Sequence, residues 1–186
     1  MRRLLIAVAL LVALVAVVFV GGMLLPQDHV AARSASYRAP PDQLWALITD
    51  VSAYPGWRSD VKTVTLLPER DGRRVWRESG GSGDITFATV ESSPPSRLVT
   101  RIEGNSDFGG TWTYVLAPAD GGSRLTIVER GEVYNPIFRF LSRFVFGHTS
   151  TIDEYLRALG RKLGEEVQPA SAEISAGREP QSPGSG

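Results

Sequence analysis

The chain has 186 residues, with 20 Lys or Arg against 20 Asp or Glu, so its formal net charge is zero. A neutral chain lacks the positive charge with which proteins neutralise phosphates, so no nucleic-acid partner is expected. Cysteine is absent, which excludes disulfides, thiolate metal sites and cysteine nucleophiles. The histidines are His29 and His148 alone, too few for a zinc site built on several imidazoles. We therefore expect neither a metal nor a cofactor.

The N-terminal segment predicts a membrane anchor. Residues 4–25 carry no charged or hydrogen-bonding side chain, and a helix of this length spans ~33 Å, enough for a hydrocarbon core of ~30 Å. Arg2 and Arg3 precede the apolar run, which favours a cytoplasmic stub of residues 1–3 and a single-pass cell-membrane protein. A cleaved secretory signal is the alternative. Both interpretations place the rest of the chain on the extracytoplasmic side.

The remaining chain divides into a linker, one domain and a tail. We assign residues 26–32 to the linker and residues 33–166 to the folded domain, which is large enough to bury a substantial core. Residues 167–186 are rich in Pro, Gly, Ser and Ala. Such a segment buries too little apolar surface to offset its ordering entropy, so we predict a disordered tail.

The first half of the domain reads as one strand, two short helices and the start of a meander. Residues 35–39 predict a short strand, and Pro41 suits the first turn of a helix over 41–48. A second helical piece, 51–54, ends at Pro55. From residue 61 the apolar period becomes two, and Gly, Asp and Pro turns separate the segments, as in antiparallel strands. The six predicted strands are 61–67, 73–79, 84–92, 97–104, 111–117 and 123–131.

The last element is an amphipathic helix that begins with Asn135 as its cap and Pro136 in its first turn. Apolar residues then recur at steps of three and four as far as Leu163. Gly147 interrupts this pattern, so the segment predicts either one long helix or two helices with a break. No other predicted helix is long enough to cover a face of the sheet. We therefore predict an α+β fold, a curved antiparallel seven-stranded sheet wrapped around the C-terminal helix, with an apolar cavity between them.

Three stretches resemble a known family. Residues 50–57, Asp-Val-Ser-Ala-Tyr-Pro-Gly-Trp, are similar to the D-x-x-x-Y-P-x-W junction of the START-like helix-grip superfamily, also called SRPBCC, in its polyketide cyclase/dehydrase and lipid-binding branch. Residues 110–116 and 122–129 resemble the sixth and seventh strands of that family. The resemblance covers about residues 33–166 and implies a helix-grip fold that binds hydrophobic small molecules or lipids. Some members catalyse cyclisation or dehydration, but no shared catalytic signature carries over to this chain.

The candidate ligand-binding residues are those predicted to face the interior of the grip: Trp57, Trp76, Phe87, Trp112, Tyr114, Glu129, Leu141, Val145, His148 and Ile152. Each has a plainer interpretation. Trp57 and the strand aromatics serve equally well as packed core, and Glu129 as a partner of a surface arginine. His148 lies on the predicted apolar stripe, where it is either an acid–base group or a satisfied buried imidazole.

Three functions remain open. The first is a membrane-anchored protein that binds a hydrophobic small molecule or lipid, with the anchor holding the pocket near the bilayer. The second is a cyclase or dehydratase that uses His148 or Glu129 in the same cavity. The third is an interaction domain whose interior is filled by its own side chains. We favour binding over catalysis, because no catalytic set is evident. Neither the ligand nor the oligomeric state can be inferred from the sequence.

Overall fold

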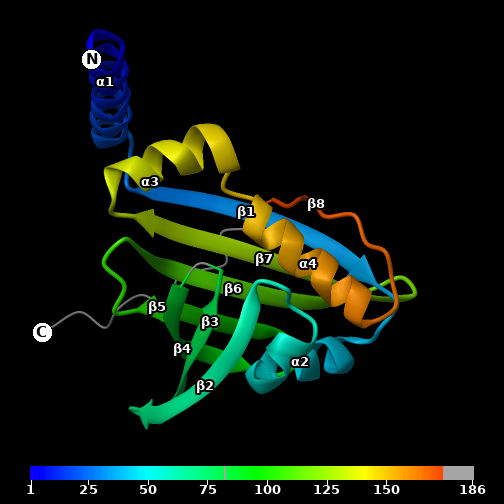
Figure 1. The fold of residues 1–186 in the computed structure, drawn as a ribbon. Coiled ribbons are helices and arrows are strands. Elements are labelled where there is room, and N and C mark those ends of the chain that lie inside the picture. The colour runs from blue at the N-terminus through cyan, green and yellow to red at the C-terminus, as the bar shows by residue number, and fades with distance from the viewer. Residues whose placement is uncertain (82, 174–186) are drawn as a thin grey trace, which may run out of the picture.

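A single antiparallel sheet dominates the computed structural model, which describes residues 1–81 and 83–173. Its strand order is β2-β3-β4-β5-β6-β7-β1-β8, and Figure 1 shows helix α4 lying across the strands at one end of this sheet. The strands are β1 (Asp28–Tyr37), β2 (Val61–Arg70), β3 (Arg73–Gly80), β4 (Gly83–Ser93), β5 (Arg97–Glu103), β6 (Phe108–Ala119), β7 (Gly122–Val133) and β8 (Ala170–Ser171). The helices are α1 (Arg2–Leu24), α2 (Pro41–Thr49), η1 (Val51–Gly56), α3 (Pro136–Leu141), η2 (Ser142–Phe146) and α4 (Ser150–Lys162).

The core lies between α4 and the inner face of the sheet. Ile152, Leu156 and Leu159 of α4 are completely buried, as their spacing of four and three residues predicts. Leu125 and Ile127 of β7 meet them and are equally buried. This arrangement is a helix-grip fold, and it confirms the predicted fold class and the six predicted strands. The sheet has one strand more than the predicted seven, because the two residues of β8 pair with β1.

The C-terminal helical region is broken at Gly147. Asn135 caps α3 as predicted, accepting hydrogen bonds from the amides of Ile137 and Phe138. The π-helical turn η2 follows, and Gly147 then adopts a φ of +74°, a left-handed value that ends the helix. The two-helix alternative is therefore the correct one. His148 lies in the break rather than on the stripe of a helix.

The folded region extends beyond both predicted domain boundaries, residues 33 and 166. Strand β1 begins at Asp28, so most of the predicted linker 26–32 is paired with β7. Its small and polar residues carry little apolar alternation, which is why the sequence pattern missed it. At the other end Val167 is buried against Gly160, and β8 follows it, so 167–173 is not disordered. Residues 174–186 of the predicted tail lie outside the described residues.

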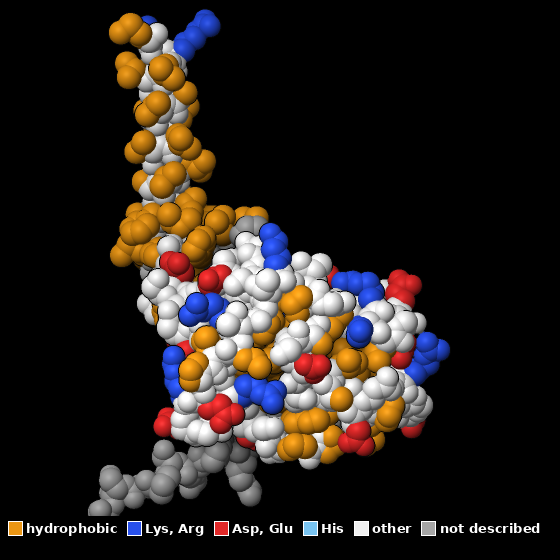
Figure 2. All heavy atoms as spheres, turned by 60° about the horizontal axis from the view of Figure 1, so that its bottom comes forward, with side chains coloured by type: hydrophobic (Ala, Val, Ile, Leu, Met, Phe, Trp, Pro, Cys, Tyr) orange, Lys and Arg blue, Asp and Glu red, His pale blue; other side chains and the backbone are white. Residues whose placement is uncertain are grey.

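Helix α1 projects from the domain and packs against α3 at its C-terminal end (Figure 1). It has 23 residues with a mean hydropathy of 3.2 in its most apolar window, and none of that window is buried. It is therefore long and apolar enough to cross a membrane. Figure 2 shows its apolar side chains exposed along its whole length.

Candidate functional site

Aromatic rings fill the space under α4 that the sequence predicted to be a cavity. Tyr155 of α4 packs edge-on against Trp57 at 5.4 Å and Trp112 at 5.9 Å between ring centroids, and lies 5.7 Å from Tyr114. Tyr54 of η1 packs against Trp57 at 5.3 Å. These contacts favour the core interpretation of Trp57 and Tyr114, and the predicted open interior beneath this part of α4 is wrong.

An ion pair is buried in the same aromatic cluster. The Arg58 guanidinium lies 2.9 Å from the Glu78 carboxylate, and the two side chains are only 13% and 8% exposed. The indole of Trp76 donates a second hydrogen bond to Glu78 at 2.9 Å. Burial raises the pKa of Glu78 above its usual value, while the Arg58 charge acts in the opposite direction. Burial also raises the pKa of Tyr54 to about 12 and that of Tyr155 well above its usual value, so both phenols stay protonated near neutral pH.

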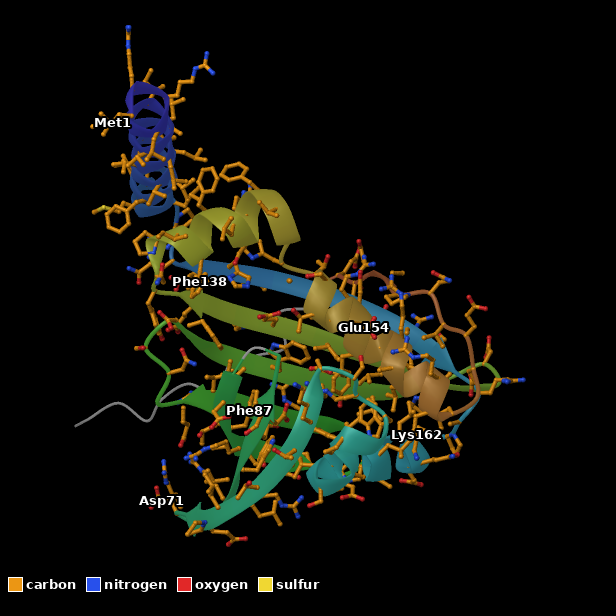
Figure 3. The ribbon with its side chains drawn as sticks, viewed as in Figure 1. Met1, Asp71, Phe87, Phe138, Glu154 and Lys162 are labelled. Carbon is orange, nitrogen blue, oxygen red and sulfur yellow. The ribbon has the colours of Figure 1, made fainter. Side chains whose placement is uncertain are left out.

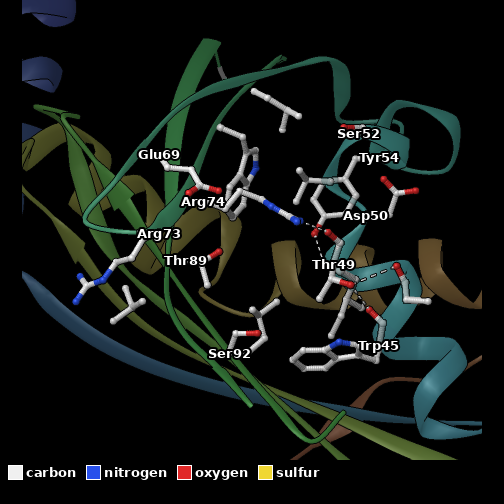
Figure 4. Close-up of a pocket in the computed structure, with 18 residues that line it drawn as sticks. Trp45, Thr49, Asp50, Ser52, Tyr54, Glu69, Arg73, Arg74, Thr89 and Ser92 are labelled. Carbon is white, nitrogen blue, oxygen red and sulfur yellow. Dashed lines mark hydrogen bonds between the residues drawn. The ribbon is translucent and has the colours of Figure 1, made fainter. Parts of the chain in front are cut away.

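A cleft of about 790 Å³ opens between α2–η1 and strands β2–β4 (Figure 4). Its apolar wall contains residues that also belong to the core, among them Ile48, Trp76 and Leu98. Trp45 and Leu66 line the same cleft, and Leu66 is 58% exposed. This volume lies within the range of small-molecule sites, ~300–1,000 Å³. The candidate site is therefore at the edge of the grip rather than under its helix.

The rim of the cleft is polar. Arg74 extends across it and donates a hydrogen bond to the backbone carbonyl of Thr49 at 2.8 Å (Figure 4). This bond ties the start of β3 to the end of α2 and so holds two walls of the cleft together. Glu69, Arg73 and Asp50 are exposed along the same rim. Eight of the 18 residues that line the cleft are polar or charged, so the cleft offers an apolar wall and an extended polar rim, which suits a ligand with an apolar part and a polar part.

The cleft lies away from α1. Figure 3 places Asp71, in the turn beside Arg73, at the opposite end of the domain from Phe138, which lies near the foot of α1. The mouth of the cleft is therefore not beside α1, the segment predicted to be the anchor. The reason is topological, because β2, β3 and α2 form the end of the grip farthest from the start of β1.

The predicted ligand-binding residues separate into three groups. Only Trp76 lines the cleft, with Phe87 stacked on it at 5.6 Å. A second group, Trp57, Trp112, Tyr114 and Ile152, lies in or against the packed core. The third group lies toward the C-terminal end of α1 and does not line the cleft; it consists of Glu129, Leu141, Val145 and His148.

His148 and Glu129 meet around His29. The two imidazoles stack at 4.0 Å, and the Nε2 atom of His29 lies 3.7 Å from Glu129. A smaller cavity of about 350 Å³ lies beside both histidines. Burial lowers the pKa of His148, and the neighbouring His29 and Arg143 lower it further. No cluster of three or more His, Asp or Glu side chains that could hold a metal occurs within the described part of the chain.

Sequence reasoning missed the residues that form the cleft wall with Trp76. Trp45 and Ile48 read correctly as an apolar helix face, but nothing showed that part of this face borders a cleft. Leu66 lies on the edge strand β2 and Arg74 on the neighbouring β3. On such strands the period-two pattern is the same whether a residue faces solvent or lines a cleft. The one available signal was Leu66, a large apolar residue on the predicted strand 61–67, which the structure places at the edge of the sheet.

The fold defines a START-like protein of the SRPBCC superfamily, as the sequence resemblance predicted. A sequence model of the family described as "Polyketide cyclase / dehydrase and lipid transport" matches residues 28–164. The chain therefore belongs to this family. A search of curated proteins found no match.

Solved structures share this fold. A START superfamily protein from Mycobacterium smegmatis is 17% identical, with a TM-score of 0.55 over 74% of this chain and 97% of that chain. The Zhui aromatase/cyclase from Streptomyces sp. R1128 is 15% identical, with a TM-score of 0.51 over 71% and 88%. The di-domain ARO/CYC StfQ from the steffimycin biosynthetic pathway is 12% identical, with a TM-score of 0.54 over 69% of this chain. The chain spans about half of that protein, 49% of its length. At these identities the likeness concerns the fold.

Proposed function

We propose that this chain is a membrane-anchored protein that binds a hydrophobic small molecule or lipid in the cleft between α2–η1 and β2–β4. The observation that carries the proposal is the cleft itself, about 790 Å³ with Ile48, Trp76 and Leu98 on its apolar wall. Burying a ligand's apolar surface there is favourable by ~25 cal/mol per Å². The family, described by cyclases, dehydrases and lipid transport, supports the same ligand class.

The anchor in this proposal is α1, a single span with its N-terminus in the cytoplasm and the domain on the extracytoplasmic side. Arg2 and Arg3 at the N-terminus support this orientation. With the cleft at the far end of the domain (Figure 3), the ligand enters from the aqueous side and not directly from the bilayer that holds α1.

Binding is favoured over the alternative, a cyclase- or dehydratase-like reaction in the same cavity. The groups predicted to move protons, His148 and Glu129, do not line the cleft. Arg58 and Glu78 form an ion pair with each other, and Glu78 also accepts a hydrogen bond from the Trp76 indole, so both charges already have partners. The third function, a domain filled by its own side chains, matches the space under α4 but not the cleft.

Two tryptophan substitutions on one strand test the proposal. Thr89 lines the cleft, whereas Thr86 lies three residues earlier on β4 and points to the opposite face, because its neighbour Phe87 faces the core. Both threonines are half-buried, so Thr86→Trp is a matched control for Thr89→Trp. The measurement is native mass spectrometry of the full chain, purified in mild detergent, to detect hydrophobic molecules that remain bound.

We expect a retained ligand in the wild type and in Thr86→Trp, and at least a fivefold lower occupancy in Thr89→Trp. A wild-type chain that repeatedly carries nothing, and takes up no fatty acid when one is added, contradicts the proposal. Equal occupancy in the two variants would place the ligand elsewhere.

A further inference from the structure

Exposed apolar side chains gather beside the foot of α1. Phe138 of α3 is 45% exposed, and Phe144 and Val145 of η2 are each 62% exposed. With Tyr134, at 39%, these four residues are named here the foot surface. Apart from Met1 and α1, the other large hydrophobic side chains exposed to this degree in the described part of the chain are Val30 and Leu66. Figure 2 shows the apolar surface of α1 widening into this region without a polar gap.

Helix α3 is packed directly against α1. A Cβ atom on Gly22 would lie 1.8 Å from the carbonyl oxygen of Pro136, so only glycine permits this approach. One residue earlier, the ring of Phe140 lies 3.1 Å from where a Cβ atom on Gly21 would be, which is closer than an ordinary van der Waals contact. The foot surface is therefore held at a fixed place relative to the end of the helix.

Arg139 fastens the same junction. Its side chain is buried and donates hydrogen bonds to the carbonyls of Gly22 and Leu25 at the end of α1, at 3.2 and 3.0 Å. It also donates to the carbonyls of Val133 and Tyr134, each at 3.0 Å. The last carbonyls of a helix lack partners within the helix and carry partial negative charge, so a cation is favoured there. These hydrogen bonds join the domain to the C-terminal end of α1.

The helix rise sets the depth of this junction. Gly21 lies four residues before the end of the apolar run at Leu25, a distance of ~6 Å along the axis. Since the run spans ~33 Å and a hydrocarbon core ~30 Å, Gly21 lies within about one helical turn of the hydrocarbon boundary, on its apolar side, when α1 spans the bilayer. Phe140 lies beside Gly21, so α3 lies at the boundary between the hydrocarbon and the lipid headgroups. Aromatic rings are enriched at this level, and an exposed cation such as Arg143 is favoured next to it.

We propose that the foot surface is embedded in the membrane interface, so that α3–η2 lies on the bilayer as a second contact of the domain with lipid. The inference rests on the proposed insertion of α1. It goes beyond anchoring, because it fixes the orientation of the domain and directs the cleft between α2–η1 and β2–β4 away from the membrane.

Depth measurements with single cysteines test the proposal, since the natural chain has none. The full chain is reconstituted in vesicles of phosphatidylcholine and phosphatidylglycerol with an NBD fluorophore at Phe144→Cys, Leu66→Cys or Leu11→Cys. The three positions are similarly exposed, at 62%, 58% and 61%. Lipids with a nitroxide near the headgroup or deep in the acyl chain serve as quenchers.

We expect NBD at position 144 to be quenched at least threefold more strongly by the shallow nitroxide than NBD at position 66. NBD at position 11 is expected to respond most to the deep nitroxide. If position 144 behaves like position 66 while position 11 is quenched, the foot surface is not in lipid, although the anchor stands. If position 11 is not quenched either, the anchor itself is refuted. Blue-shifted but unquenched emission at position 144 indicates cover by a second copy and overturns the proposal.

A second variant tests the rigid junction. Gly22→Val places side-chain atoms where the Pro136 carbonyl lies, so α3 must move away from α1. Combined with Phe144→Cys, it is expected to reduce shallow quenching at position 144 at least twofold while quenching at position 11 stays unchanged. Unchanged quenching at both positions contradicts the clamped geometry on which the proposal rests.

Discussion

Removing the charge of Glu78 is expected to destabilise the domain, because Arg58 is then left in the aromatic core with Asp60, a half-exposed carboxylate, as its remaining ion-pair partner. At 2.9 Å two unit charges attract by ~5–6 kcal/mol when the effective dielectric constant is ~20. Part of this attraction only offsets the cost of burying both groups. Asp60, which is half exposed, remains paired with Arg58 and limits the loss.

For Glu78→Gln we therefore expect a loss of ~2–3 kcal/mol in the free energy of unfolding, below the ~3–5 kcal/mol typical of a broken buried pair, because Asp60 still contacts Arg58. Glutamine keeps an acceptor for the Trp76 indole. Arg58→Leu is expected to cost more, because Glu78 then retains only that neutral hydrogen bond. The double variant is expected to be more stable than the sum of the two losses predicts, by ~2 kcal/mol or more.

The assay is urea unfolding of the full chain in lipid nanodiscs, followed by tryptophan fluorescence at pH 7. The pH dependence of Arg58→Leu supplies a second readout. Burial raises the pKa of Glu78, and in this variant no guanidinium opposes it, so the folded domain holds the proton more tightly than the unfolded chain. The stability of Arg58→Leu is then greatest at low pH and falls as pH rises through the folded pKa of Glu78. A loss below ~1 kcal/mol in Glu78→Gln, or strict additivity in the double variant, would refute the reasoning.

Three further changes have defined outcomes. The pKa of His148 is lowered in the folded state, so the unfolded chain binds its proton more readily. The neutral imidazole therefore contributes stability above pH ~6.5, and this contribution is lost as pH falls through the folded pKa. His148→Ala is expected to reduce the drop in melting temperature between pH 7.5 and 5, and an unchanged drop argues against this assignment. Ile152→Ala, at a fully buried site, is expected to lower the free energy of unfolding in urea by ~2–4 kcal/mol. Val145→Ala, at a site that is 62% exposed, is expected to change it by less than ~0.5 kcal/mol. Similar losses in the two variants would contradict the burial pattern. Tyr37→Phe removes a hydrogen bond to the Leu156 carbonyl and is expected to lose ~1 kcal/mol, which thermal unfolding detects; an unchanged melting temperature contradicts the bond.

The architecture followed from periodicity because long, strongly patterned segments dominate this fold. Strands β2–β7 alternate clearly between turn residues, and Ile152, Leu156 and Leu159 mark one face of α4. The extra length of β1 was not predictable in this way. Its residues, such as Ala31 and Ala35, are small, and their burial depends on pairing with β7. The break at Gly147 was foreseen as a possibility because glycine is a weak helix former.

The candidate site was predicted less well than the fold. Apolar residues that face the interior read the same whether they line a cavity or fill it, so Tyr114 and Trp57 were indistinguishable from Trp76 in the sequence. The difference arises from how η1 and α2 close over the sheet, which is a matter of tertiary packing. Likewise, the placement of His148 beside His29 depends on the helix break and on the early start of β1.

The central claim is that a hydrophobic ligand lies in the cleft between α2–η1 and β2–β4. The most direct measurement is photo-crosslinking of the full chain in nanodiscs with a diazirine fatty acid, followed by mass-spectrometric mapping of the modified residues. The account predicts modification within residues 45–54 and 66–76, reduced by an excess of unlabelled fatty acid. Modification confined to α1 and residues 134–145, with none in the cleft that competes, would contradict it.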